Sequence, residues 1–202
     1  MILISFNSYS QEFKMKRKTL ISGIIEEYNV LKTNDKIKQG DYKLIYRNAI
    51  MIKGFYNNDK RDSIWIFYND SHDTILVYDY REDKVLNFKC QDIFQNCKDK
   101  KSPAFYSYGF CTILQNFSLK MKYPDHAAEN GLQGTAFVNV VIDANGKVIN
   151  TFLKNGTGYH DLDKEAIRVV NESCQGDWIP AIGEDGKPTI DILTFKSTFK
   201  LR

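Results

Sequence analysis

The sequence has little that would commit it to a membrane, a metal site or a nucleic acid. Its apolar runs are only a few residues long, whereas a bilayer span takes about 20 apolar residues, so we expect no transmembrane helix. Its three histidines are scattered singly and its four cysteines include no CxxC pair, which leaves no zinc-like spacing. A net charge of +3 lacks the excess of a nucleic-acid-binding protein. What remains is a globular composition in a chain of 202 residues, enough for one or two domains.

The four cysteines, at positions 90, 97, 111 and 174, leave two alternatives open. An even number permits disulfides but does not demand them. If the protein is exported, Cys90 with Cys97 would close the shortest loop; the alternative is four separate free thiols.

Catalytic motifs are also missing. The sequence has no Gly-rich phosphate loop, no Gly-x-Ser-x-Gly and no His-Glu-x-x-His. One cluster, Tyr159-His160-Asp161, has acid–base character, but Asp161 as the N-cap of a helix and Asp163 in its first turn are explained by the helix dipole. We therefore expect no enzyme, no cofactor and no metal ligands.

Residues 1–38 are interpreted as a lead-in. Leu20, Ile24 and Tyr28 recur at every fourth position, a weak helical pattern within a Lys-rich stretch. The apolar start followed by a small polar run is similar to the tail of a secretory signal, so we expect a signal or anchor that is truncated here.

Residues 39–90 carry short aromatic runs separated by Asn, Asp and Gly, which predict consecutive antiparallel strands. Gly40-Asp-Tyr42 recurs as Ser63-Ile-Trp65, and the same offset leads from Ile45 to Tyr68. This pattern resembles the membrane occupation and recognition nexus (MORN) type of hairpin repeat, and a plain β-meander with coincidental spacing is the alternative. Residues 91–104, which show no sustained period, are interpreted as a linker.

Residues 105–202 predict a second module of α+β class. The pattern gives a short helix over 126–130, strands over 135–143 and 148–153, a helix from 161 to about 174, and a final strand over 189–201. The expected architecture is a two-layer sandwich, a three-stranded antiparallel sheet with two helices, preceded by the small antiparallel hairpin module. Trp178 is expected in its core.

Six short signatures occur in this module in a fixed order: Tyr123-Pro124, Leu132-Gln-Gly134, Asp143-Ala-Asn-Gly146-Lys-Val148, Leu162-Asp-x-Glu-Ala-Ile-Arg168, Trp178-Ile-Pro180-Ala181 and Gly186-Lys-Pro188. Together they resemble the C-terminal domain of TonB-family energy transducers over residues 105–202. The resemblance implies a periplasmic, non-enzymatic protein whose partner is an outer-membrane TonB-dependent receptor or another envelope protein. A homodimer is left open. An energy-transducing member would also have a membrane anchor and a Pro-rich spacer, whereas this chain has four prolines, none adjacent.

The resemblance places partner contacts on the last strand and just ahead of the Tyr-Pro pair. The residues are Lys122, Tyr123, Thr194, Lys196, Thr198 and Lys200. In the last strand, Leu193, Phe195, Phe199 and Leu201 alternate with these polar residues, so the apolar set is expected to face the helices.

Two functions of that strand remain open. An edge strand can add an extended, acidic partner segment as a further strand, or its lysines can guard the edge against aggregation. A different class of function is a structural adaptor that binds its partner through the aromatic hairpins around Tyr42, Tyr46, Trp65 and Tyr68.

Overall fold

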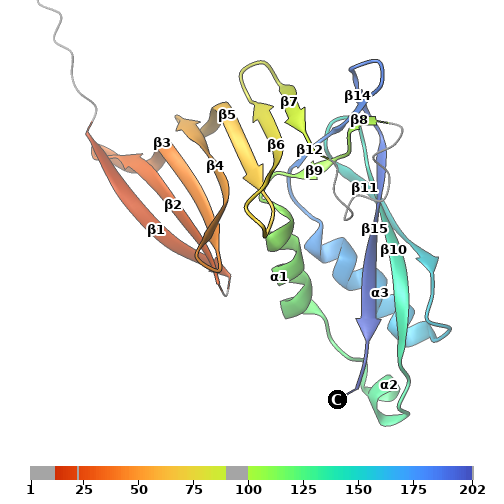
Figure 1. The fold of residues 1–202 in the computed structure, drawn as a ribbon. Helices are drawn as coiled ribbons and strands as arrows, with labels where there is room; N and C mark the ends of the chain where they lie inside the picture. The colour runs from red at the N-terminus through yellow and green to blue at the C-terminus, as the bar shows by residue number, and fades with distance from the viewer. Residues whose placement is uncertain (1–11, 22, 90–99, 202) are drawn as a thin grey trace, which may run out of the picture.

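The computed structural model describes residues 12–21, 23–89 and 100–201 (Figure 1). Its N-terminal half is a seven-stranded antiparallel meander in which every strand pairs with its neighbours in sequence. The strands are β1 (Phe13–Ile21), β2 (Ile24–Leu31), β3 (Asn34–Tyr46), β4 (Ala49–Asn57), β5 (Lys60–Tyr68), β6 (Thr74–Asp79) and β7 (Lys84–Phe88). Two-residue turns at Arg47-Asn48 and Asn58-Asp59 have positive φ throughout, the backbone that tight hairpins require.

The helix-like interpretation of residues 14–38 is wrong, because these residues form β1, β2 and the start of β3. The sheet that was expected to begin near residue 39 therefore begins at Phe13. A spacing of four fits a strand as well as a helix, since four is a multiple of the strand period of two. Ile24 is fully buried, and Leu20 and Tyr28 pack on the same core. The apolar start at residues 1–6 lies outside the described residues.

The repeat that begins at Gly40 and Ser63 is visible in the backbone. Both residues have positive φ, 99° and 59°, and their aromatic followers Tyr42 and Trp65 lie with ring centroids 5.1 Å apart. Both rings are buried. The two copies are therefore structurally equivalent, while the resemblance to MORN-type repeats stays a prediction.

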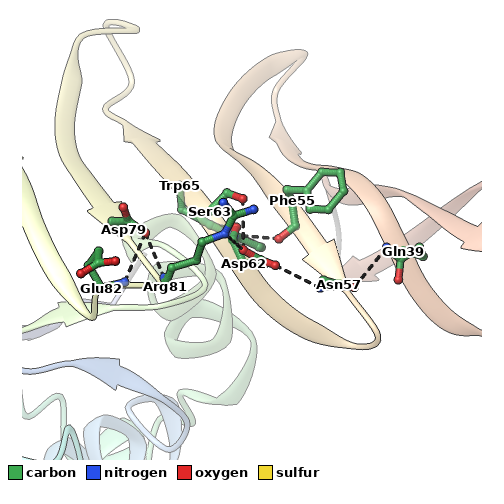
Figure 2. A network of polar contacts seen from close by, with 9 residues as sticks. All are labelled: Gln39, Phe55, Asn57, Asp62, Ser63, Trp65, Asp79, Arg81 and Glu82. Carbon is green, nitrogen blue, oxygen red and sulfur yellow. Dashed lines mark hydrogen bonds and ion pairs between the residues drawn. The ribbon is translucent and has the colours of Figure 1, made fainter.

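A chain of polar contacts crosses the strands beside this repeat (Figure 2). Gln39 Nε2 donates to Asn57 Oδ1 (3.3 Å), Asn57 Nδ2 donates to Asp62 Oδ2 (3.1 Å), and the Arg81 guanidinium pairs with Asp62. Gln39 directly precedes Gly40, and Asp62 directly precedes Ser63. The repeat therefore includes the polar position next to each positive-φ residue.

The C-terminal half contains the predicted three-stranded antiparallel sheet. β10 (Gly134–Ile142) lies between β11 (Val148–Asn155) and β15 (Asp191–Phe199). Helix α3 (His160–Ser173) packs on it through Leu162, Ala166 and Val170. The short helix α2 (Asp125–Glu129) and the strands match the predicted elements closely, and Trp178 is buried as expected. The α+β fold class is confirmed.

A third helix, α1 (Phe110–Lys120), was missed. Its buried residues Cys111, Thr112 and Ile113 are consecutive, so they form no single stripe. The reason is that Cys111 packs into the core of the meander and Ile113 into the core of the C-terminal half. Figure 1 shows α1 between the two sheets.

Two small sheets complete the junction between the halves. β9 (Phe105–Tyr106) pairs with β12 (Trp178–Ile179), and β13 (Ala181–Gly183) lies between β8 (Lys100–Ser102) and β14 (Pro188–Thr189). The expected linker over 91–104 is therefore wrong where β8 lies, and residues 91–99 lie outside the described residues. Phe105 packs edge-on against Phe67 of the meander (5.0 Å), which joins the two cores.

Candidate partner-binding site

Strand β15 lies at an edge of its sheet, with β10 on one side and no described strand on the other (Figure 1). Its register with β10 is unbroken from Asp191 to Phe199. Leu193, Ser197 and Phe199 are buried, whereas Lys196 and Thr198 are exposed. The predicted alternation of this strand is confirmed.

One hydrogen bond shows which backbone N–H groups of β15 point away from β10. Ile192 N–H donates to its neighbour's carboxylate, Asp191 Oδ1 (2.8 Å), and so does not face β10. Because N–H directions alternate along an antiparallel strand, those of Thr194, Lys196 and Thr198 also face the edge. The polar residues predicted on β15 therefore coincide with the edge-facing backbone groups.

Two side chains on the outer face of β15, those of Thr194 and Thr198, contact side chains of β10. Thr194 Oγ1 donates to Asn139 Oδ1 (2.9 Å), and the hydroxyls of Thr198 and Thr135 lie 3.2 Å apart. Both contacts hold β15 to β10. Lys196 and Lys200 are exposed.

Lys122 and Tyr123 lie in the connection between α1 and α2. The Tyr123 ring packs edge-on against Phe199 at the end of β15 (5.8 Å), and its hydroxyl donates to the carbonyl of Leu132. The structure thus brings the two predicted contact regions together at one end of β15. The Tyr123 hydroxyl is therefore engaged within the domain, whereas the Lys122 side chain is exposed.

Glu165 of α3 anchors this connection. Its carboxylate accepts the Lys122 N–H (2.7 Å) and the Arg168 guanidinium (2.6 Å), and Arg168 Nη2 also donates to Lys120 O (2.8 Å). Burial acts to raise the pKa of Glu165, but the hydrogen bonds from Arg168 and Lys122 outweigh it and lower that pKa below its ordinary value.

Two apolar side chains on the outer face of the sheet were not singled out from the sequence. Ile192 and Phe152 are 40% and 39% exposed, and the register puts Ile192 beside Val141 and Phe152 beside Asn139. Ile192 could have been found, since it continues the outward set of Thr194, Lys196 and Thr198.

The residues that the sequence analysis weighed for acid–base, thiol or metal chemistry are described next. Asp161 is not the N-cap of α3, because Tyr159 holds that position; Asp161 lies 3.1 Å from His126 Nδ1 instead. Cys111 and Cys174 are free and buried, and burial raises their thiol pKa to about 11 and about 12. Cys90 and Cys97 lie outside the described residues, so their predicted pairing stays a prediction. No group of three or more metal-ligating side chains occurs in the described part of the chain.

Residues 120–201 match the family model of the Gram-negative bacterial TonB protein C-terminal. This segment belongs to the TonB C-terminal domain family. The match begins at the last residue of α1 and includes α2, α3 and the whole β11-β10-β15 sheet, which confirms the predicted family membership for these residues. This TonB domain, residues 120–201, contains all six residues that the resemblance places in contact with a partner.

A solved structure is similar to part of this chain. The NMR solution structure of the Helicobacter pylori TonB C-terminal domain is similar over 46% of this chain and 80% of that chain, at 20% identity and a TM-score of 0.38. No curated protein matches the chain. Within the described residues, no helix has the length and apolar character that a membrane crossing requires.

Proposed function

We propose that the TonB domain of this chain binds an extended segment of an outer-membrane TonB-dependent receptor, or of another envelope protein, by strand addition to β15. The function is non-enzymatic and is exerted in the periplasm. The observation that carries the proposal is the edge position of β15, whose outward N–H groups form a template for a further strand.

Charge at this edge favours an acidic partner segment. Lys196 is exposed on the strand and Lys200 directly after it, and Lys122 lies beside Tyr123 at the same end. Backbone pairing supplies affinity with little demand on sequence, while the lysines select for carboxylates.

The alternative adaptor function is less well supported by the meander. Tyr42 and Trp65 are 1% and 0% exposed, so they are core residues and leave only Tyr46 and Tyr68 of the proposed aromatic surface for contact. The Tyr42 and Trp65 rings lie in a core that also contains Phe105, Cys111 and Ile179, so they offer no contact surface for this function.

A proline at the edge tests strand addition. Thr198→Pro removes one outward N–H, and Thr198→Ala is the matched control because it keeps that N–H. The probes are synthetic acidic peptides taken from outer-membrane receptors, measured by fluorescence anisotropy. We expect Thr198→Pro to abolish binding with little change in thermal unfolding, and Thr198→Ala to bind as the unchanged chain does.

Substitution of the two lysines distinguishes an edge that binds a partner from an edge that is protected against aggregation. Replacing Lys196 and Lys200 by Ser should weaken binding of acidic peptides and flatten its dependence on salt. If the double variant binds unchanged but self-associates in sedimentation velocity experiments, the lysines guard the edge and strand addition is not the function.

A further inference from the structure

The two copies of the meander repeat each place a cation over three aromatic rings. Lys38 Nζ lies 4.6 Å from the Tyr28 ring, 5.4 Å from the Tyr42 ring and 5.0 Å from the Tyr56 ring. At the equivalent position of the second copy, Arg61 Cζ lies 4.5 Å from Trp65 and 5.4 Å from Tyr80. A third ring, Tyr108, lies 4.9 Å from Arg61. The copies therefore share one arrangement of cation and rings.

The two copies differ in whether a carboxylate lies beside the cation. In the first copy Glu26 is only 5% exposed, accepts the Tyr42 hydroxyl (2.8 Å) and lies 3.5 Å from Lys38 Nζ. Glu26 pairs across the sheet with Leu44, the second residue after Tyr42. Its carboxylate thus neutralises the cation within the first copy.

An isoleucine occupies the corresponding place in the second copy. Ile52 pairs with Phe67, the second residue after Trp65, and is 1% exposed. Arg61 has no carboxylate within 4.0 Å among the described residues; its hydrogen bond goes to the Tyr80 hydroxyl (2.6 Å). Among the residues that the structure describes, this half-buried guanidinium is therefore compensated by neutral hydroxyls and ring faces.

A cavity of about 510 Å³ adjoins Arg61 between the meander and the TonB domain. Tyr78, Tyr80 and Ser107 line it beside Arg61, and Trp178 and Pro180 form an apolar wall. Its volume is within the range of small-ligand sites.

Two carboxylates also line the cavity. Asp83 accepts the Tyr78 hydroxyl, and Asp177 lies 3.5 Å from Lys147 Nζ. Both side chains are exposed. They disfavour phosphate and other multiply charged anions, but they offer acceptors to an ammonium group on the same ligand.

We propose that this cavity binds a zwitterionic small ligand, a free amino acid or a short peptide, whose carboxylate pairs with Arg61 and whose ammonium faces Asp83 and Asp177. The ligand carboxylate supplies the charge that Glu26 supplies in the first copy. Arginine holds a carboxylate through two parallel N–H donors, and the aromatic walls shield that pair from water. The site is distinct from the β15 edge, so either can fail without the other.

The test uses the full chain and four probes: dialanine, N-acetyl-dialanine, dialanine amide and inorganic phosphate. Isothermal titration should show saturable binding of dialanine, weaker binding of the acetylated form, and no binding of the amide or of phosphate. The amide matters most, because it lacks only the carboxylate that Arg61 is expected to hold.

Variants assign the binding to this cavity. Arg61→Gln should weaken dialanine binding at least tenfold, about 1.4 kcal/mol. Arg47→Gln is the matched control, since Arg47 is an exposed arginine that also lies over a tyrosine ring, that of Tyr46 (5.0 Å). If Arg61→Gln does not fold, Asp177→Asn at an exposed position still tests the site, because it should weaken dialanine but not N-acetyl-dialanine.

Several results would overturn the proposal. They are absence of dialanine binding at millimolar concentration, equal binding of dialanine and its amide, and unchanged binding by folded Arg61→Gln or by Asp177→Asn. The results with dialanine, its amide or Arg61→Gln would leave Arg61 as a structural cation held by its aromatic neighbours. Unchanged binding by Asp177→Asn would remove the ammonium contact that the proposal requires.

Discussion

Lys100 and Asp191, far apart in the sequence, form an ion pair that joins β8 to the first residue of β15. Asp191 is fully buried, and its other oxygen accepts the Ala104 N–H (2.8 Å). A buried carboxylate is stable only when its partners are in place. The residues just before the TonB domain therefore support the strand that we propose to bind the partner.

Removing the cation of this pair should be costly. Lys100→Met leaves the Asp191 carboxylate buried without its counter-ion, and we expect a loss of about 3 to 5 kcal/mol in the free energy of unfolding. Urea denaturation measures it, with Lys101→Met as an exposed control. Adding Asp191→Asn should restore part of the loss, because the amide carries no charge. A loss no larger than that of Lys101→Met would contradict the role of the pair.

The contacts of Asp191 also predict where the shortest stable C-terminal segment begins. From the sequence we predict that residues 105–202 fold alone, but that segment lacks Lys100 and Ala104, two partners of Asp191. A segment of residues 100–202 should therefore unfold at a higher temperature than one of residues 105–202. Circular dichroism melting of both segments measures the difference. Equal melting temperatures would show that β8 adds nothing to the domain.

The two described thiols should be unreactive in the folded chain. Burial raises the thiol pKa of Cys111 to about 11 and of Cys174 to about 12, so at pH 8 only about one in a thousand Cys111 side chains is a thiolate. Iodoacetamide labelling with peptide mass spectrometry should find both unlabelled until urea is added.

The raised pKa of the two buried thiols also predicts that the folded chain loses stability at high pH. Above pH 9 the unfolded thiols ionise while the folded ones stay protonated, so the free energy of unfolding should fall as the pH rises from about 9 toward 11. Cys174→Ala should flatten this fall. Rapid labelling of Cys174 under native conditions would contradict its burial.

Glu165, in contrast to the thiols, should stabilise the folded chain at neutral pH and lose that contribution as the pH falls. Burial opposes the shift, but hydrogen bonds from Arg168 and Lys122 lower its folded pKa. The contribution is therefore present above the ordinary pKa of 4.5 and is lost as the pH falls below it. Glu165→Gln should be less stable at pH 7 and should lose less stability between pH 5 and pH 3. Glu129→Gln, at an exposed position of α2, is the control and should change neither.

Local patterns in the sequence determined the β11-β10-β15 sheet, α3 and the outward residues of β15. Strand alternation and helical spacing are short-range properties, and each of these elements buries one face against one core, so a single period shows in the sequence. The meander repeat was visible for a similar reason: Gly40 and Ser63 both have a positive φ, and Tyr42 and Trp65 fill the same core.

Only the tertiary structure decided the features that depend on two partners at once. Helix α1 escaped because it is buried on opposite sides by two cores, which erases its stripe. Leu20, Ile24 and Tyr28 fit both periods, and the pairing of β1 with β2 and of β2 with β3 decided that they form strands. The Arg61 cavity joins β5 to loops of the TonB domain much later in the chain, and no local spacing records that distance. Side chains that meet across such separations leave no periodic signal, because their contact is a property of the folded chain.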